Sequence, residues 1–402
     1  MSSNNEKDDL TLAALFEEVS EKQPKSPYED FFLPSNPFPA VGQFIPGICV
    51  DQDEIKQEFA RTLREFYVDE RARRMTIVGS TGAGKTNLLR FFQQQLEKWR
   101  EPQPGRRPIT DLFTLFIHQP QGSYFEIHRQ FISQLGALFY TKFFEAVQSG
   151  KVDLATLPAE LPGLSPELVR VLAQVASRRQ LQLSYFGPNL QSVRILDDWL
   201  QGVKLSATDK KYLGSISVEV GKSSTMAVKF LGDLLKIFRH AGLFKGIVVF
   251  FDEFEEVLSG LSRVNQAQYA QDLRNLFDTV TEGVVFVIGT APISDSLNQI
   301  SPALNRRLGE GISIEPIRDE ETALTYAQAY IQLGRTNFKK HMQREVVLPE
   351  NCPEEDRPYY PLMYATVVEV YRGLQEKQVD IVPGDLLPEL NLRLYRRVYE
   401  GS

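Results

Sequence analysis

The chain has 402 residues, with 45 basic and 52 acidic side chains and a formal net charge of −7 at pH 7. Hydrophobic residues make up 42% and charged residues 24%, so a sizeable core can form and a wholly disordered chain is excluded. The two cysteines, Cys49 and Cys352, lie far apart, which excludes a disulfide scaffold and a cysteine-rich zinc site. No uncharged apolar stretch approaches the ~18–20 residues of a membrane span, and the polar, acidic start differs from a secretory signal. These features predict a cytoplasmic protein without a membrane segment.

Acidic residues are concentrated near the N-terminus. Residues 1–36 carry a net charge of −5, so the rest of the chain is nearly neutral and lacks a general electrostatic footprint for nucleic acid. We interpret residues 1–45 as an acidic, proline-rich leader. Within it, a short amphipathic helix over residues 10–19 would place these side chains on one side: Leu10, Leu12, Leu15, Phe16 and Val19. Two interpretations stay open, a tail that packs loosely on the body and an arm that binds a partner.

Helical and strand patterns alternate along the chain after residue 50. Apolar residues spaced by three or four predict helices over residues 51–70, 87–99, 124–140, 226–240 and 266–282, and residues 141–225 are mostly helical in pattern. Short apolar runs predict strands over residues 75–78, 111–118, 246–251, 283–289 and 312–314, after which the chain turns helical to its end. This alternation predicts a three-layer α/β fold, with a parallel sheet covered on both faces.

A glycine-rich loop joins the first predicted strand to the helix that follows it. Its sequence matches the phosphate-binding pattern G-x-x-x-x-G-K-[ST] (Walker A) and is followed by Asn87: Gly79-Ser80-Thr81-Gly82-Ala83-Gly84-Lys85-Thr86. Small residues let backbone N–H groups point inward around a phosphate, at the positive end of the helix. Lys85 would contact the β- and γ-phosphates, and the Thr86 hydroxyl would hold Mg²⁺. A plain strand-to-helix turn is the alternative, but the full pattern in this context favours binding of ATP with Mg²⁺.

Two carboxylates follow the strongest strand pattern of the chain. Residues 246–251 run directly into Asp252 and Glu253, which places both acids at the carboxyl edge of the sheet (Walker B). Asp252 would coordinate Mg²⁺ and Glu253 would act as general base on the attacking water. The alternative is a strand end followed by a solvated acidic helix start, because Glu255 and Glu256 continue the acidic run. Lys85 and Asp252 are 167 residues apart, so we interpret residues 141–225 as a helical insertion.

Two further positions are candidates for catalysis. Thr290 ends the predicted strand over residues 283–289, where it could position the water or sense the γ-phosphate; an ordinary strand-end turn is the alternative. Arg306 and Arg307 precede the last short strand, and one of them could act on the nucleotide of a neighbouring subunit as an arginine finger. A solvated helix end is the alternative, and the sequence does not say which arginine points outward.

With these motifs in this order, the chain resembles an AAA+ ATPase, a P-loop NTPase of the additional-strand-catalytic-glutamate class, over roughly residues 45–330. It is similar to the origin-recognition and initiator branch in three segments: Asp51-Gln-Asp-Glu-Ile55, Tyr124-Phe-Glu-Ile127 and the cadence of helix, Gly242, strand and Asp-Glu over residues 231–257. Asp198-Trp-Leu-Gln-Gly202, followed by Ala241-Gly-Leu-Phe-Lys-Gly246, also resembles bacterial phage-defence ATPases of the BREX type.

The resemblance implies a nucleotide-binding domain over residues 46–317 and a helical lid over residues 318–402. It also implies hydrolysis of ATP to ADP and phosphate, driving assembly or remodelling on DNA within a multi-protein system. Origin-binding relatives carry a winged-helix domain after the lid, whereas 85 residues follow Ile317, enough for a lid but hardly for a further domain. An obvious Gly-x-x-Arg sensor is missing from the lid, where Tyr360-Pro-Leu-Met363 stands instead.

Basic clusters and histidines carry weaker signals. Three short clusters could contact a phosphate backbone or simply be solvated: Arg71, Arg73 and Arg74; Lys339 and Lys340; Arg393, Arg396 and Arg397. The four histidines, at positions 118, 128, 240 and 341, show no metal-ligand spacing, so we expect core or surface roles for them.

Two functions stay open at this point. The first is an oligomeric ATPase that acts on or with double-stranded DNA, together with further proteins of a system such as phage defence or mobile-element control. The second is a nucleotide-controlled signalling switch, in which the leader and the insertion recruit a protein partner without direct DNA binding. A small-molecule kinase fits the long insertion and the lid poorly.

Overall fold

The computed structural model describes residues 26–400, apart from residues 42, 44, 46, 103–107, 119–122, 186–190, 215, 217, 256–260 and 293–300. The predicted helix over residues 10–19 lies outside the described residues. The chain divides into two compact units, which we describe separately: residues 51–315, and residues up to 50 together with those from 316 onward. Among the described helices, none has the length and apolarity needed to cross a lipid bilayer.

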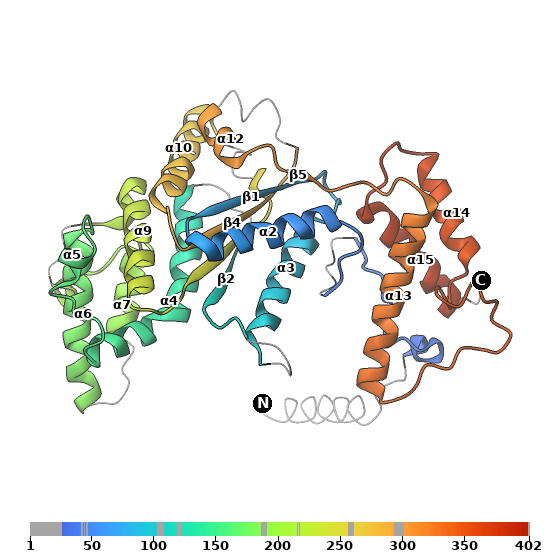
Figure 1. Ribbon diagram of the computed structural model, residues 1–402, viewed down its shortest axis with the longest axis horizontal. Coiled ribbons are helices and arrows are strands. Elements are labelled where there is room, and N and C mark those ends of the chain that lie inside the picture. Colours follow the sequence, from blue (N-terminus) through green and yellow to red (C-terminus); the bar gives the residue numbers. More distant parts are fainter. Residues whose placement is uncertain are drawn as a thin grey trace, which may run out of the picture. The chain divides into compact units, whose positions relative to one another are not determined.

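Five parallel strands form the sheet of the unit 51–315, in the order β2-β3-β4-β1-β5 (Figure 1). Their bounds are β1 Arg73–Val78, β2 Leu112–Ile117, β3 Gly246–Phe251, β4 Val284–Thr290 and β5 Ile312–Ser313. β3 and β4 are buried along their whole length, because bulky apolar side chains fill both faces of these central strands. The predicted α/β P-loop NTPase fold is confirmed, and β4 is the additional strand between β1 and β3.

Helices cover both faces of this sheet. On one face lie α2 (Asp53–Asp69) and α3 (Lys85–Arg100), where the ring of Phe59 stacks 4.1 Å from that of Phe92. The other face carries α4 (Tyr124–Gln148), α9 (Ser224–His240), α10 (Arg263–Thr279) and α12 (Pro302–Leu308). The alternation of side chains along a strand explains this division, since Phe250 faces Phe59 whereas Phe251 faces Phe131 of α4. The sheet is thus the middle of three layers.

The segment predicted as an insertion is mostly helical. α4 extends eight residues beyond its predicted end at Tyr140, because Phe143 and Phe144 continue its buried stripe. The elements that follow are α5 Leu157–Glu160, α6 Pro166–Tyr185, α7 Gln191–Leu200, α8 Ala207–Tyr212 and η2 Val220–Lys222. Trp199 anchors them to α9, since its indole is buried, lies 5.2 Å from the ring of Phe230 and donates to the Val218 carbonyl at 2.9 Å. These helices share one hydrophobic core with α4 and α9.

Two glutamines of α4 pair with the backbone of β2, the strand at one edge of the sheet. The Gln134 amide accepts from the Phe116 N–H and donates to the Phe116 carbonyl, both at 3.0 Å. Gln130 repeats this arrangement at His118, with both hydrogen bonds at 2.9 Å. The side-chain amides therefore satisfy backbone groups that an edge strand would otherwise leave to solvent or to another strand.

The second unit is helical. It contains η1 (Pro27–Phe31), α13 (Glu320–Met342), α14 (Tyr364–Gln375) and α15 (Pro383–Tyr399). Leu33 and Phe38, from the segment interpreted as a leader, are buried in the same core as Ile331 and Leu390. One sequence expectation was wrong here: the chain is not helical throughout its C-terminal part, because residues 343–363 are irregular. Prolines at 349, 353, 358 and 361 remove backbone donors from this stretch.

Candidate nucleotide site

The glycine-rich loop leaves β1 and turns back on itself before α3 begins at Lys85. Gly82 and Gly84 have φ angles of +82° and +97°, a left-handed conformation that glycine adopts without strain. The Gly79 N–H donates to the Thr290 carbonyl at 3.0 Å, which fixes the start of the loop to the end of β4. No heavy atom lies within 4 Å of the position that a Gly84 Cβ would occupy. The loop therefore has the left-handed turns that bend its backbone around a phosphate, and there is open space beside Gly84.

Lys85 is drawn inward, with 8% of its surface exposed. Its amine donates to the carbonyls of Gly79 at 2.8 Å and of Ser80 at 3.3 Å. The same amine lies 3.4 Å from a carboxylate oxygen of Glu255. Three oxygen atoms of the chain thus hold the Lys85 amine at the loop, where it would also meet the oxygens of a bound phosphate.

Thr86 and Asp252 meet at the carboxyl edge of the sheet. The Thr86 hydroxyl donates to Asp252 Oδ1 at 3.1 Å, although the two residues are far apart in sequence. Asp252 is 3% exposed; burial raises the pKa of its carboxyl group, while the Thr86 hydrogen bond and the Lys85 charge oppose that rise. A hydroxyl beside a carboxylate suits Mg²⁺, which takes few protein ligands and completes its shell with phosphate and water oxygens. Within the described ranges, no group of three or more His, Cys, Asp or Glu side chains could hold a metal by itself.

Glu253 adopts an uncommon backbone conformation. Its φ angle is +53°, in the left-handed region that costs a non-glycine residue about 1–2 kcal/mol. Its N–H donates to Asp252 Oδ1 at 3.1 Å, so the Asp252 carboxylate helps to hold this turn. Such strain is characteristic of positions whose side chain must be aimed by the surrounding structure.

The remaining predicted residues fall into different surroundings. Thr290 ends β4 with 3% of its surface exposed and pairs in register with Val78, the residue before the glycine-rich loop. The Arg307 guanidinium donates to both carboxylate oxygens of Asp278, at 2.7 and 2.8 Å, and this contact raises the pKa of the guanidinium. Arg306 is exposed, and no acidic side chain of the described residues pairs with it. The structure therefore separates the two arginines that the sequence could not tell apart.

Part of the chain matches the model of a known protein family. Residues 189–324 match the family model "BREX system ATP-binding protein BrxC/D". The predicted likeness to the BREX ATP-binding proteins is confirmed over this stretch, which holds Asp252, Glu253, Thr290 and both arginines. Among curated proteins, none matches the chain at a significant level.

A solved structure also resembles the chain. It is the crystal structure of Cdc6p from Pyrobaculum aerophilum, with 13% sequence identity and a TM-score of 0.42. The match covers 90% of this chain and 64% of that one, so the chain spans less than two thirds of the length of that protein.

Sequence reasoning missed three side chains at this site. Glu255, which entered the sequence analysis only through the alternative of a solvated acidic run, pairs with Lys85. Arg90 lies one helical turn after Thr86 on α3, with its guanidinium 3.4 Å from the centre of the Phe116 ring and in contact with His118. Burial and the Arg90 charge lower the pKa of His118, and the Glu253 carboxylate opposes this. The sequence held a signal for both residues, because His118 directly follows β2, which neighbours β3, and Arg90 shares a helix face with Thr86.

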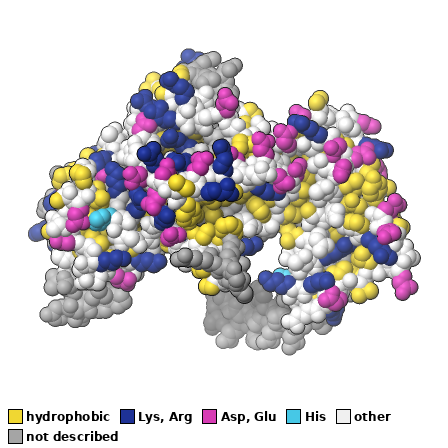
Figure 2. All heavy atoms as spheres, viewed as in Figure 1, with side chains coloured by type: hydrophobic (Ala, Val, Ile, Leu, Met, Phe, Trp, Pro, Cys, Tyr) yellow, Lys and Arg dark blue, Asp and Glu magenta, His cyan; other side chains and the backbone are white. Residues whose placement is uncertain are grey.

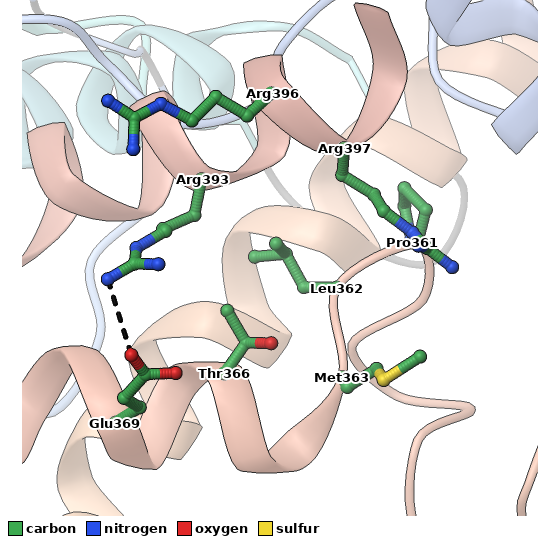
Figure 3. Close-up of a pocket in the computed structure, with 8 residues that line it drawn as sticks. All are labelled: Pro361, Leu362, Met363, Thr366, Glu369, Arg393, Arg396 and Arg397. Carbon is green, nitrogen blue, oxygen red and sulfur yellow. Dashed lines mark hydrogen bonds and ion pairs between the residues drawn. The ribbon is translucent and has the colours of Figure 1, made fainter. Parts of the chain in front are cut away.

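The structure also distinguishes the three basic clusters. On the face shown in Figure 2, basic and acidic side chains are interspersed over the unit 51–315. Arg73 pairs with Asp69 at 2.7 Å, and Lys339 pairs with Glu345 at 2.6 Å. Arg74 lies over the ring of Phe277 and donates to the Phe277 carbonyl at 3.4 Å. In the cluster on α15, by contrast, Arg396 and Arg397 have no acidic partner within the part of the chain that the structure describes. Figure 3 shows these arginines around a pocket.

Proposed function

We propose that this protein binds ATP with Mg²⁺ and hydrolyses it to ADP and phosphate, as one component of a cytoplasmic phage-defence system of the BREX type. The observation that carries this proposal is the 3.1 Å hydrogen bond from Thr86 to Asp252. It joins the glycine-rich loop and the acidic motif in one site, at the edge of the sheet where parallel α/β proteins bind their ligands.

Each residue has a distinct task in this proposal. The Gly79 and Ala83 N–H groups are bonded within the chain, so the other N–H groups of the loop and the Lys85 amine would bind the phosphates. Thr86 and Asp252 would hold Mg²⁺. The ion, when bound, neutralises charge on the phosphate oxygens. Glu253 accepts a proton from the attacking water, and its fixed backbone turn aims the carboxylate at that water. Thr290, next to the loop on β4, positions the water.

We further propose that the protein works as a homo-oligomer, with Arg306 acting on the nucleotide of a neighbouring copy. Arg306 is the suitable member of the pair because it is exposed, whereas Arg307 is committed to Asp278. Turnover would then depend on assembly, and in a BREX-type system we expect the assembled protein to act with DNA and with further proteins of the same system.

ATP turnover per molecule, measured over a range of protein concentrations with and without double-stranded DNA, tests this proposal. We expect the rate to rise steeply with concentration. Lys85→Ala should abolish nucleotide binding, and Glu253→Gln should bind ATP but lose at least a hundredfold in turnover, the usual contribution of a general base. Turnover that survives Lys85→Ala would refute the assigned site.

The oligomeric part has its own control. Arg306→Ala should retain ATP binding and lose about a thousandfold in rate, as removal of an arginine finger does. Arg263→Ala removes another exposed arginine, at the start of α10, and should leave the rate unchanged. A rate per molecule that is flat with concentration, or equal effects of the two variants, would rule out action between subunits.

A further inference from the structure

A pocket of about 250 Å³ lies in the helical unit, between α14, α15 and the segment 361–363 (Figure 3). We call it the arginine pocket, because Arg393, Arg396 and Arg397 line it. Arg393 lies 3.4 Å from Glu369 across the pocket. Arg396 and Arg397 find no carboxylate among the described side chains, so the pocket has a net positive charge.

The segment 361–363, which forms one wall of the arginine pocket, is held by hydrogen bonds at both ends. Arg335 on α13 is 8% exposed and donates to the carbonyls of Arg357 at 2.8 Å and Tyr360 at 3.0 Å. The Tyr364 N–H donates to Asp356 at 2.6 Å, which holds the other end of the same segment. Residues 361–363 are therefore held in place before anything binds, which lowers the entropic cost of binding there.

Apolar side chains are exposed on the elements that carry the pocket. Met363, which lines it, is 46% exposed, and so is Tyr395 of α15. Leu392, one turn before Arg396, is 41% exposed, and Tyr395 stacks with Tyr399 at 4.5 Å between ring centres. Arginines beside exposed apolar side chains suit a partner that is acidic and amphipathic.

The chain itself supplies such a partner next to the pocket. The first described element, η1, contacts residues close in sequence to the pocket lining: the ring of Phe31 is 6.0 Å from that of Tyr360, and the ring of Tyr28 is 5.9 Å from that of Tyr399. The sequence just before η1, residues 1–25, has six acids and three bases. It also has the apolar residues of the predicted amphipathic pattern over 10–19.

The segment before Ser26 is long enough to reach from η1 towards the arginine pocket. Glu17, Glu18 and Glu21 precede Ser26 by five to nine residues, and a chain of that length spans up to about 30 Å. A tethered segment binds at an effective concentration in the millimolar range, so a contact that would be weak between separate molecules becomes well populated.

We propose that residues 1–25 dock on the arginine pocket of the same chain. The acids at 17, 18 and 21 face Arg396 and Arg397, and the apolar positions of 10–19 cover Met363, Leu392 and Tyr395. This contact goes beyond the proposed ATPase and does not depend on it. Because its charged part is exposed, it weakens as salt rises.

Hydrogen exchange of the full-length chain tests this docking. We expect amides of residues 10–21 to exchange at least fivefold more slowly than in the free peptide of the same sequence. Arg396→Glu/Arg397→Glu should remove this protection, and so should Glu17→Arg/Glu18→Arg. The combination of all four changes should restore it, because the charges are exchanged but remain complementary. Lys339→Glu/Lys340→Glu, a matched reversal elsewhere in the same unit, should have no effect.

Three outcomes would overturn the proposal. In the first, the amides of residues 10–21 exchange as fast as in the free peptide. In the second, the arginine reversal leaves their protection unchanged while the core amides of α15 stay protected. In the third, the variant with all four substitutions does not restore the protection. A fourth result would give the pocket to another occupant: if the arginine reversal abolishes binding of a labelled DNA duplex but leaves the leader unaffected, the pocket is a nucleic-acid surface.

Discussion

The Lys85 amine is shared among oxygen atoms that belong to the chain itself. Two are loop carbonyls and the third is the carboxylate of Glu255, whose second oxygen is buried without a hydrogen-bond partner among the described atoms. A phosphate that approaches Lys85 must compete with this carboxylate for the amine and is also repelled by its charge. Glu255 should therefore weaken nucleotide binding, although it lies in the middle of the site.

Glu255→Gln is expected to tighten ATP binding about tenfold, since an uncharged amide competes less for the lysine and does not repel the phosphates. Titration with a fluorescent ATP analogue measures the change. Glu253→Gln, which removes the same charge from a residue without a contact to Lys85, should change affinity less. Unaltered or weaker binding by the Glu255 variant would show that its carboxylate does not compete with phosphate.

At the scale of elements, local patterns predicted most of the site. The strand over residues 246–251 was predicted with its observed bounds, and the other four differ by one or two residues at an end, because short apolar runs are a local property. The glycine-rich loop and Asp252 were readable for the same reason. The partners Glu255, Asp278 and Gln134 were not, since each depends on packing between segments far apart in sequence. The burial of Leu33 and Phe38 in the C-terminal unit is likewise a long-range property.

His128 shows what one buried side chain does for the junction of α4 and α7. It is fully buried and its Nε2 lies 2.6 Å from the Leu200 carbonyl, so the neutral ring donates this hydrogen bond. Burial lowers the pKa of His128 to about 4, with the Leu200 carbonyl opposing and the Arg129 charge adding to the effect. The unfolded chain takes up a proton near pH 6.5, whereas the folded chain resists it down to about pH 4. The contribution of the neutral His128 ring to the free energy of unfolding is therefore complete above about pH 6.5 and is lost as the pH falls towards 4.

His128→Gln keeps a donor for the Leu200 carbonyl but removes the titrating ring. We expect the loss of stability between pH 7 and pH 4.5 to shrink by about 2–3 kcal/mol relative to the unaltered protein. Urea unfolding at the two pH values measures it, and because each protein serves as its own reference, the acidic residues common to both cancel. An equal loss in both proteins would show that His128 is protonated in the folded state.

At the scale of the whole molecule, the chain has two hydrophobic cores. One surrounds the sheet and the helices of the unit 51–315, and the other joins α13, α14 and α15 to residues 28–50. The two clusters share no residue, so each unit has its own source of hydrophobic stabilisation.

Leu390→Ala, in the core of the C-terminal unit, should therefore destabilise that unit by about 2–5 kcal/mol and leave the other nearly unchanged. Leu273→Ala on α10, equally buried, is the reciprocal variant. Hydrogen exchange resolved by segment distinguishes the units. If either substitution speeds exchange to the same extent in residues 51–315 and 316–400, the two cores unfold as one.

The two α4 glutamines that bond to the edge of the sheet have a consequence for the protein at high concentration. A sheet grows when a foreign strand finds free amides and carbonyls along its outermost member. Gln130 and Gln134 occupy such groups at Phe116 and His118. Replacement of both glutamines by alanine would expose the backbone groups of an edge strand. We expect such a variant to aggregate while its hydrophobic core stays intact. Two side-chain amides that take no part in the proposed chemistry thus protect this edge of the sheet from pairing with another molecule.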